Sequence, residues 1–503
     1  MLVAIAFFHF FARPEFVLHS TDSVYYLAGA KSLAEGTGYR MVLYDDAPRI
    51  GLYPPLQSFY LSLFWRLNGS FPANLWLLQS GMVGLILLTS TLLYFVLLRC
   101  RAPLWFAALL SLSFAVQPNT YVNAIAMMSD LLFATLSFSL ALWWLGRRED
   151  FAPRHWWVSG ILLGLMFLTR TAAAPILLGT GLALSANAVF RRQWRPLFWC
   201  VAPMAAAVAF WMLFPKDTLT YGHYYRETED GNVFARGLSG YLLQCGLRAI
   251  RYASTELVEC ITAGTPQFLA SVFPASAVWL QTCRVAVGLI AFAAVLLAAF
   301  GYCRHSARVW RVIGAILLLY YVQIIFWPWE LGPRAVMPLL PFLCIGFTEG
   351  IKHLPALARH WMPRAVSLVL LIGIVPSAWI VCTVKAHPQD IHREDEVKAL
   401  SIWARDNIPA NARLATHLDW AKSQFPMMHF VSWSGHRLTQ TRGENAGIFA
   451  RRADYLLFES FPTARNSVEL PEPGAVGQVI YRTPLNTFQV LRVVRTRATE
   501  TAN

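Results

Sequence analysis

The sequence predicts an α-helical polytopic membrane protein with a small α/β domain at its C-terminal end. The 503 residues are 56% hydrophobic and only 14% charged, whereas soluble globular chains carry about 25% charged residues. Apolar runs recur along residues 1–384, and several approach the ~20 residues that a bilayer requires. The scattered Gly and Pro and the many aromatic residues exclude a fibrous or disordered chain.

About eleven apolar runs are expected to cross the membrane as helices. They fall at 1–18, 74–98, 103–120, 127–145, 156–169, 172–190, 197–214, 284–302, 310–327, 335–351 and 365–384. The first run is interrupted by Arg13 and Pro14 and has no basic segment before it. We therefore interpret it as a retained first helix, which a few residues upstream would complete, and not as a signal peptide.

The short connections on one side of these runs hold most of the basic residues. They are Arg99, Arg101, Arg147, Arg148, Arg154, Arg191, Arg192, Arg195, Arg304, Arg308, Arg311, Lys352, Arg359 and Arg364. Because basic loops favour the cytoplasm, the N-terminus is expected inside, and the long segments 19–73, 215–283 and 385–503 outside. The same distribution accounts for the net charge of +14. We expect no nucleic-acid partner, since no soluble segment combines a basic patch with interleaved aromatic residues.

Residues 385–503 are expected to form an extracytoplasmic α/β domain, separate from the membrane domain at 1–384. An amphipathic helix is predicted at 394–407, with strands at 413–416, 455–458, 476–481 and 488–494. The stretch from Leu238 to Ile261 is also amphipathic and is expected to lie on the membrane surface. Within it, Cys245 and Cys260 either pair or are two unrelated thiols.

Ionisable residues are nearly absent from the apolar runs and gather near their outer ends. These residues are Asp22, Asp130, Arg170, Arg284 and Arg334. Charges at membrane depth are costly and tend to be functional. An ion-driven transporter is expected to place such groups near the midplane, often in two related halves. The pattern instead favours a site at the outer boundary, where a lipid-borne substrate meets a water-borne one.

Several short motifs occur in a particular order along this framework. They are Asp22 after the first run, the Tyr26…Ala30…Gly36 spacing, Tyr53-Pro54-Pro55-Leu56, Ser129-Asp130, Arg170, and Gly332-Pro333-Arg334 before a run with Pro338 and Pro341. In this order, residues 1–384 resemble the GT-C class of integral-membrane glycosyltransferases. The nearest members are the protein O-mannosyltransferases, the aminoarabinose transferases of lipid A and the rhizobial lipopolysaccharide core transferases.

The resemblance implies transfer of a sugar from a polyprenyl-phosphate donor to a protein, lipid or glycan acceptor outside the cytoplasm. It also implies that Asp22 is the catalytic carboxylate and that Asp130 supports it in the site. The preference for arginine over lysine is typical of a GC-rich bacterial genome, which favours a bacterial inner membrane. Ser23 stands where many of these enzymes have a second acid, and Tyr53 where the aminoarabinose transferases have a lysine. We therefore expect no metal or other cofactor; the alternative is a divalent cation held by Asp22 and Asp130.

Each residue of this predicted site has a role in transfer and a plainer alternative. Asp22 would accept the acceptor's proton, or it simply caps a helix; Asp130 has the same alternative. Arg334, then Arg170, would bind the donor phosphate, because a guanidinium grips two phosphate oxygens; otherwise both snorkel to the interface.

Four tyrosines are expected to contact substrate, Tyr26 and Tyr53 in the first external segment and Tyr224 and Tyr225 at the acceptor entrance. The rival functions are a transporter or flippase for lipid-linked sugars and a non-catalytic GT-C-like assembly subunit.

Overall fold

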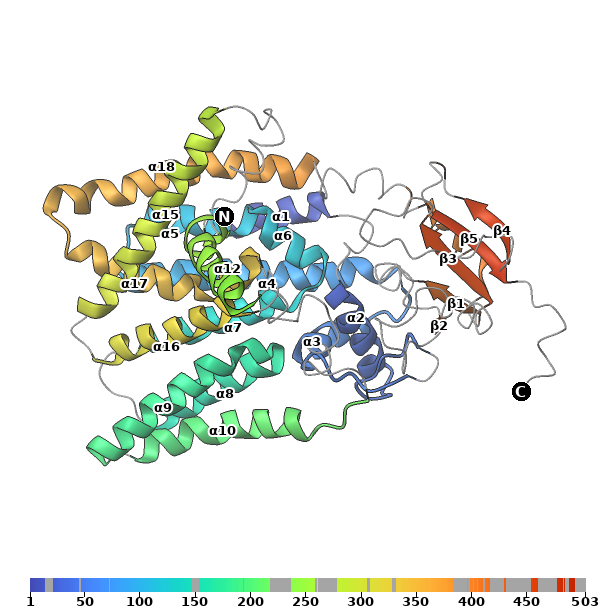
Figure 1. Cartoon of the computed structure of the whole chain (residues 1–503), viewed down its shortest axis with the longest axis horizontal. Helices are drawn as coiled ribbons and strands as arrows, with labels where there is room; N and C mark the ends of the chain where they lie inside the picture. The colour runs from blue at the N-terminus through green and yellow to red at the C-terminus, as the bar shows by residue number, and fades with distance from the viewer. Residues whose placement is uncertain are drawn as a thin grey trace. The chain divides into compact units, whose positions relative to one another are not determined.

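The computed structural model describes most of the first 383 residues and parts of the remainder. The described residues are 1–13, 21–44, 47–71, 73–146, 153–192, 194–217, 237–257, 260, 278–304, 308–327, 332–383, 396, 399–400, 402–404, 406–409, 412–416, 429–430, 454–459, 477–482, 484 and 488–493. Figure 1 shows a chain that is helical up to α18 and ends in a small sheet.

The helices follow one another with short breaks. They are α1 (Leu2–Ala12), α2 (Thr21–Ala34), α3 (Leu56–Trp65), α4 (Leu75–Arg99), α5 (Leu104–Val116), α6 (Pro118–Ile125), α7 (Ser129–Leu145), α8 (Pro153–Thr169), η1 (Thr171–Ala173), α9 (Ala174–Arg191), α10 (Trp194–Leu213), α12 (Gly237–Arg251), η3 (Tyr252–Glu256), α15 (Val278–Arg304), α16 (Arg308–Ile325), η4 (Pro333–Ala335), η5 (Met337–Leu339), α17 (Leu340–Lys352) and α18 (Ala356–Thr383). Here η1, η4 and η5 are 3₁₀ turns and η3 is a π-helical turn.

The chain divides into two compact units, which are described separately here. The first comprises Met1–Arg13, Gln79–Phe214 and Asn232–Lys385, and the second comprises Pro14–Leu78, Pro215–Gly231 and Ala386–Asn503. The first unit holds most of the apolar helices. The second holds α2, α3 and the sheet. The domain boundary between residues 384 and 385 stays a prediction.

Each of the eleven predicted apolar runs contains a helix in the described chain. Five helical stretches are long and apolar enough to cross a membrane, and the bent pair α6–α7 would add a sixth if it forms one span. The five are Leu75–Arg99, Thr171–Phe190, Trp194–Leu213, Pro333–Lys352 and Ala356–Trp379. The protein therefore has several helices able to span a bilayer, and the count of eleven stays a prediction.

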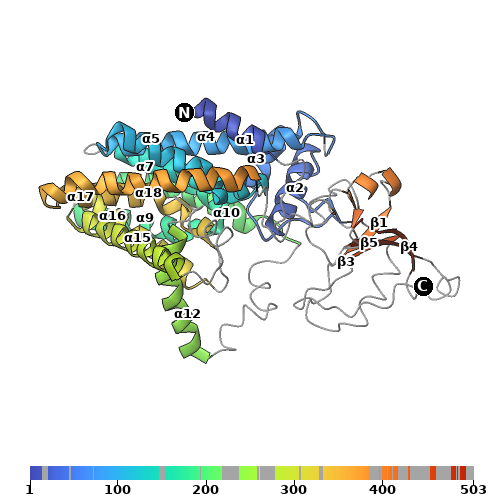
Figure 2. The same ribbon diagram turned by 90° about the horizontal axis from the view of Figure 1, so that it is seen from above.

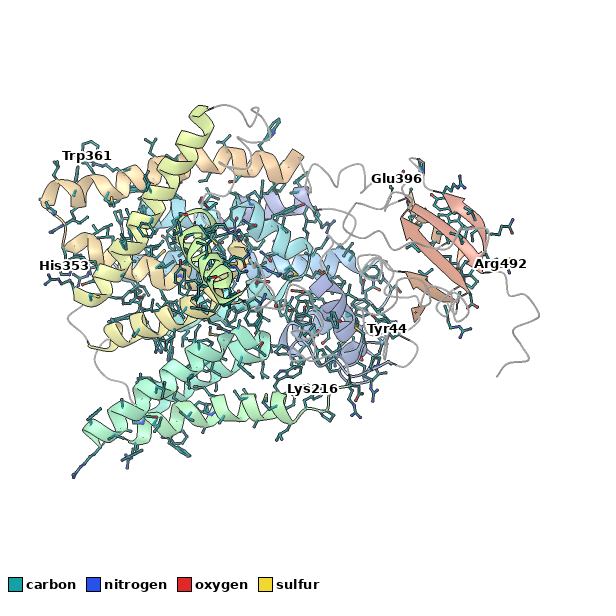
Figure 3. All side chains as sticks on the ribbon, in the orientation of Figure 1. Tyr44, Lys216, His353, Trp361, Glu396 and Arg492 are labelled. Atoms are coloured by element: carbon teal, nitrogen blue, oxygen red, sulfur yellow. The ribbon has the colours of Figure 1, made fainter. Side chains whose placement is uncertain are left out.

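Large apolar side chains cover the outside of the helical unit. Phe190, Leu213 and Trp361 are all exposed, and Figure 3 shows Trp361 projecting from the surface of α18. A soluble protein rarely exposes so many large apolar groups together. Such side chains are expected to contact lipid.

One predicted run is broken in the structure. The apolar run 103–120 was expected to be a single helix, but α5 ends at Val116 and α6 begins at Pro118. Gln117, between them, has extended backbone (φ −72°, ψ 144°), because a residue that precedes proline avoids the helical region. Its side chain accepts a hydrogen bond from the amide of Asn119 and so caps α6. Pro118 fits the first turn, where no amide donor is needed.

A second break separates α6 from α7, which are bent by 118° to each other. Met127, in the bend, has a positive φ of 52°, which a long side chain rarely adopts. The new helix begins at Ser129, so Asp130 lies in its first turn. The bend therefore decides where this carboxylate is presented.

The backbones of α15 and α17 approach each other very closely. A β-carbon built on Gly301 would lie 2.1 Å from the carbonyl oxygen of Gly346 and 2.6 Å from the amide nitrogen of Gly350. Only glycine fits there. Small residues of this kind allow membrane helices to pack backbone against backbone.

The C-terminal sheet has the strand order β2-β1-β3-β5-β4, and Figure 2 shows it from a second direction. Its strands are β1 (Arg413–Thr416), β2 (His429–Phe430), β3 (Tyr455–Glu459), β4 (Gly477–Arg482) and β5 (Phe488–Val493). β1 pairs in parallel with β2 and β3, whereas β5 pairs antiparallel with β3 and β4. The four predicted strands match β1, β3, β4 and β5 to within one residue at each end. The assignment of residues 385–503 to an α/β domain stays a prediction.

Candidate active site

Asp22 lies in the first turn of α2, in the second unit. The unpaired amides at a helix N-terminus stabilise a negative charge. The carboxylate of Asp22 therefore lies at the end of α2 that carries these amides.

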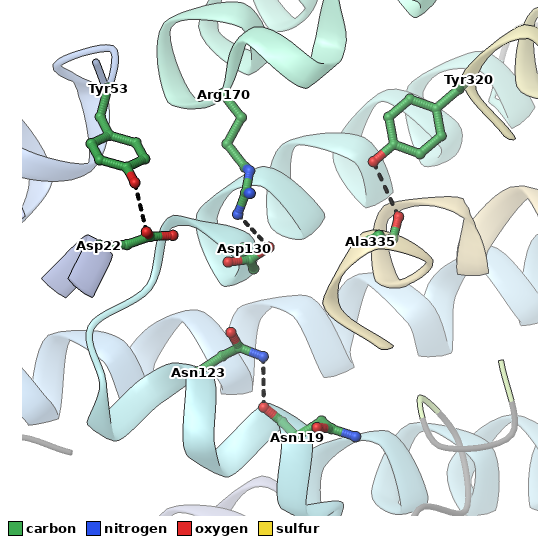
Figure 4. A network of polar contacts seen from close by, with 8 residues as sticks. All are labelled: Asp22, Tyr53, Asn119, Asn123, Asp130, Arg170, Tyr320 and Ala335. Atoms are coloured by element: carbon green, nitrogen blue, oxygen red, sulfur yellow. Dashed lines mark hydrogen bonds and ion pairs between the residues drawn. The ribbon is translucent and has the colours of Figure 1, made fainter. Parts of the chain in front are cut away.

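Tyr53 holds the Asp22 carboxylate. Its hydroxyl donates a hydrogen bond to Oδ1 of Asp22 at 2.6 Å (Figure 4). The Tyr53 ring packs against the rings of Tyr25 and Tyr26, with centroids 5.1 and 5.3 Å away, and its backbone carbonyl accepts a hydrogen bond from the Tyr39 hydroxyl at 3.0 Å. Because ring and backbone are both fixed, Tyr53 can hold the acid in one orientation.

Tyr53→Phe is expected to lower the transfer rate about tenfold or more, because a hydrogen bond to a charged group contributes roughly 1.5–3 kcal/mol. Steady-state transfer assays on the purified protein would measure it. Tyr60→Phe makes the same chemical change on α3 and is the matched control. Equal rates for the two variants would show that the Asp22–Tyr53 bond is irrelevant to the reaction.

Asp130 and Arg170 form a buried ion pair in the first unit. Nη1 of Arg170 lies 2.5 Å from Oδ1 of Asp130, and their side chains are 18% and 3% exposed (Figure 4). Arg170 follows the last residue of α8 with extended backbone (φ −150°, ψ 130°). This break ends the helix and lets the guanidinium reach α7. Buried charges are tolerated when they are paired in this way.

The ion pair uses Oδ1 of Asp130 and leaves the second carboxylate oxygen, Oδ2, to be accounted for. Oδ2 of Asp130 is buried and has no hydrogen-bond partner within the described part of the chain. A buried oxygen without a donor costs free energy. A hydroxyl or amine of a bound substrate would satisfy it.

Arg334 lies on a turn that is tied to the same region. Tyr320 of α16 donates a hydrogen bond from its hydroxyl to the carbonyl of Ala335 at 3.1 Å (Figure 4). Tyr320 is also close enough to Asp130 and Arg170 for both charges to act on its hydroxyl. Ser137 follows Asp130 on α7, and its hydroxyl donates to the carbonyl of Pro338 at 2.6 Å. The turn that carries Arg334 therefore packs beside the Asp130–Arg170 pair.

The predicted site residues thus fall into two groups. Asp130, Arg170 and Arg334 belong to the first unit, and Asp22, Tyr26 and Tyr53 to the second. Tyr26 is fully buried against Tyr53. Tyr224 and Tyr225 lie outside the described residues. The side chain of Arg284 also lies outside them. The role of each residue in a reaction stays a prediction.

Tyr320 was missed in the sequence, and so was the bond that Tyr53 makes. A tyrosine inside an apolar run looks like a membrane-facing aromatic, and only its partner reveals the polar role. The signal available was weak: a buried tyrosine needs a partner for its hydroxyl.

Among the residues that the structure describes, no group of three or more His, Cys, Asp or Glu side chains could hold a metal ion. The histidine–carbonyl bond of His9 to Ala115 (2.8 Å) lies within the packed helices of the first unit.

No protein-family model matches the sequence, and no curated protein matches it either. The solved structures that are similar to this one include two of ArnT and one of an oligosaccharyltransferase. ArnT from Cupriavidus metallidurans bound to undecaprenyl phosphate has a TM-score of 0.58 and 13% identity over 98% of each chain. Its apo state has a TM-score of 0.57 and 13% identity over 98% of this chain and 97% of that one. The apo oligosaccharyltransferase from Archaeoglobus fulgidus has a TM-score of 0.53 and 12% identity, over 98% of this chain and 74% of that one.

These structures are GT-C glycosyltransferases. The chain described here therefore has the GT-C fold, and the resemblance noted in its sequence is confirmed at the level of the fold.

Proposed function

We propose that this protein is a membrane glycosyltransferase that moves a sugar from a polyprenyl-phosphate donor to an extracytoplasmic acceptor. The observation that carries the proposal is the similarity, over nearly the whole of both chains, to an ArnT structure bound to undecaprenyl phosphate. The carboxylate of Asp22, held by Tyr53, supplies the group that such a transfer needs.

The reaction forms one bond and breaks one. The acceptor hydroxyl attacks the anomeric carbon, its proton passes to Asp22, and the bond from that carbon to the phosphate oxygen breaks. A positioned base contributes roughly 10²–10⁴ in rate. The departing polyprenyl phosphate gains negative charge, which an arginine stabilises best in a dry site. Arg334 is proposed for this task.

Within the first unit, Asp130 and Arg170 are proposed to contact substrate. The ion pair fixes the orientation of the Asp130 carboxylate. Its oxygen Oδ2 would then accept a hydrogen bond from a substrate hydroxyl or amine. Arg170 remains the second candidate for the phosphate, because a guanidinium can bind two phosphate oxygens at once.

The proposed reaction takes place at the outer face of a bacterial inner membrane. We propose eleven crossings, a cytoplasmic N-terminus and an extracytoplasmic α/β domain at 385–503. Four exposed apolar side chains on α12 support a place for that helix on the lipid surface; they are Leu242, Leu243, Leu247 and Ile250.

Detecting transfer of a sugar to an acceptor would test the proposed function directly. The purified protein would be reconstituted in liposomes with lipid-linked sugars extracted from a bacterial membrane, and mass spectrometry would identify the sugars that co-purify and the products that form. A new glycosylated product together with released polyprenyl phosphate supports the proposal. Movement of the lipid-linked sugar across the bilayer without a product would indicate a flippase. Neither product nor movement would indicate a non-catalytic subunit.

Arg334→Ala is expected to raise the dissociation constant for undecaprenyl phosphate about tenfold or more, because a hydrogen bond to a charged group contributes roughly 1.5–3 kcal/mol. Tryptophan-fluorescence titration with undecaprenyl phosphate in detergent would measure it. Arg359→Ala, at an exposed position near the start of α18, controls for a general loss of charge. Weaker acceptor binding with unchanged donor binding would move the phosphate site away from Arg334.

A further inference from the structure

The π-helical turn η3 (Tyr252–Glu256) lies between α12 and Leu257, and its residues Tyr252, Ala253 and Glu256 are buried. π-Helical turns are rare and occur frequently at functional sites. The last turn of α12, just before the π-helical turn, is bonded to α16: the Tyr321 hydroxyl donates to the carbonyl of Ala249 at 2.6 Å. Arg248, also on α12, donates to the carbonyl of Trp327, just after α16. The π-helical turn therefore continues a helix that is anchored to α16, the helix that also carries Tyr320.

Glu256 ends this turn and is a buried acid that the proposed mechanism does not use. Its side chain is 9% exposed, and its Oε1 lies 3.0 Å from Nε of Arg251, whose side chain is 36% exposed. A carboxylate is buried at a cost unless it is paired. Arg251 supplies that partner.

The carboxylate of Glu256 faces the turn that bears Arg334. A β-carbon built on Gly332 would lie 4.0 Å from Oε2 of Glu256. Gly332 has φ 65° and ψ −165°, a backbone conformation that essentially only glycine adopts. The buried carboxylate of Glu256 thus lies next to the residue of the turn whose backbone conformation requires glycine.

Two hydrogen bonds hold the same turn from either side. Cys260, a free thiol that follows the π-helical turn, donates from Sγ to the carbonyl of Pro333 at 3.0 Å. Tyr320 donates to the carbonyl of Ala335 at 3.1 Å. Arg334 stands between these two bonded carbonyls. Cys245 is also free, so the sequence alternative of a Cys245–Cys260 disulfide is not realised.

We infer that Glu256 is a positioning residue: with Cys260 and Tyr320 it fixes the Gly332–Ala335 turn and thereby the place of Arg334 at the donor phosphate. Only the link from Arg334 to the donor phosphate rests on the proposed function. It touches no reacting atom, so it acts through Arg334.

The test uses Glu256→Gln, which removes the charge and keeps the shape. Glu349→Gln is the matched control, because Glu349 forms an exposed pair with Lys352 on α17. If Glu256→Gln lowers the yield of folded protein, the double variant Arg251→Ala/Glu256→Gln replaces it, since it removes both charges of the pair. Two readouts are taken on the full chain: hydrogen exchange at the amides of Ala335 and Val336, and binding of undecaprenyl phosphate.

In the native turn these two amides donate to the carbonyls of Gly332 and Pro333, at 3.2 and 3.0 Å. The expected result for Glu256→Gln is faster exchange at both amides and a dissociation constant raised about tenfold, the size of effect that a residue acting through another produces. Glu256→Asp, which keeps the charge, is expected to recover part of the affinity. Glu349→Gln is expected to change neither readout.

The outcomes separate the two ideas. Unchanged exchange at residues 335 and 336 overturns the inference, whatever binding does. Faster exchange with unchanged binding overturns the link from the turn to the donor phosphate. A loss of binding in Arg334→Ala but none in Glu256→Gln keeps the proposed function and rejects the role of Glu256.

Discussion

Asp22→Asn is expected to abolish nearly all transfer, with a loss of about 10²–10⁴ in kcat, because an amide cannot accept the proton of the attacking hydroxyl. The substitution keeps the size of the side chain. Oδ1 can still accept the hydrogen bond from Tyr53. Binding of undecaprenyl phosphate is therefore expected to stay near the native value, which separates loss of chemistry from loss of binding.

The measurement is a single-turnover transfer assay in liposomes, with folding and insertion checked by size-exclusion chromatography and protease protection. Glu35→Gln is the matched control, because Glu35 is an acid that directly follows the other end of α2, and its side chain is 46% exposed and forms an i,i+4 contact with Lys31 at 3.9 Å. Near-native transfer by Asp22→Asn would remove Asp22 from the catalytic role. A similar loss in both variants would indicate damage to α2 and its surroundings.

Arg170→Ala is expected to destabilise the first unit by about 3–5 kcal/mol, because it leaves the buried charge of Asp130 without its partner. This prediction does not depend on the proposed function. Thermal unfolding in detergent would show a lower midpoint. The double variant Asp130→Asn/Arg170→Ala is expected to recover much of the loss, because the charge that would be stranded is then absent.

The control for this pair is Lys352→Ala. Lys352 pairs with Glu349 at a far more exposed position, and such surface pairs contribute about 0–1 kcal/mol. Equal unfolding midpoints for Arg170→Ala and Lys352→Ala would contradict the view that burial makes the Asp130–Arg170 pair important. Additive losses in the double variant would contradict the coupling of the two charges.

Most helices and strands could be predicted because their signals are local. Runs of apolar residues marked α4, α9, α10 and α15, and alternating residues marked β1, β3, β4 and β5. The two-residue strand β2 is too short to show alternation, so it was missed. The bend between α6 and α7 interrupts a sequence that is apolar on both sides, and hydropathy alone does not show such a bend.

The contacts of the candidate site could not be predicted, because they join distant parts of the chain. Asp22 and Tyr53 are 31 residues apart, and each was assigned to substrate or catalysis by itself. Asp130 and Arg170 were expected at one depth, but their direct pairing depends on the extended residue that ends α8. Glu256 was one acid in an amphipathic stretch. Its importance becomes visible only from its distance to Gly332.

The close glycine contact between α15 and α17 also limits where the lipid tail of the proposed donor could enter the protein. With Gly301 against Gly346 and Gly350, main chain rests on main chain and no side chain can swing aside. We therefore expect the two helices to move together as one rigid body. If the donor carries a long isoprenoid tail, as proposed, the entrance for that tail therefore has to lie between other helices, where bulky side chains can rotate.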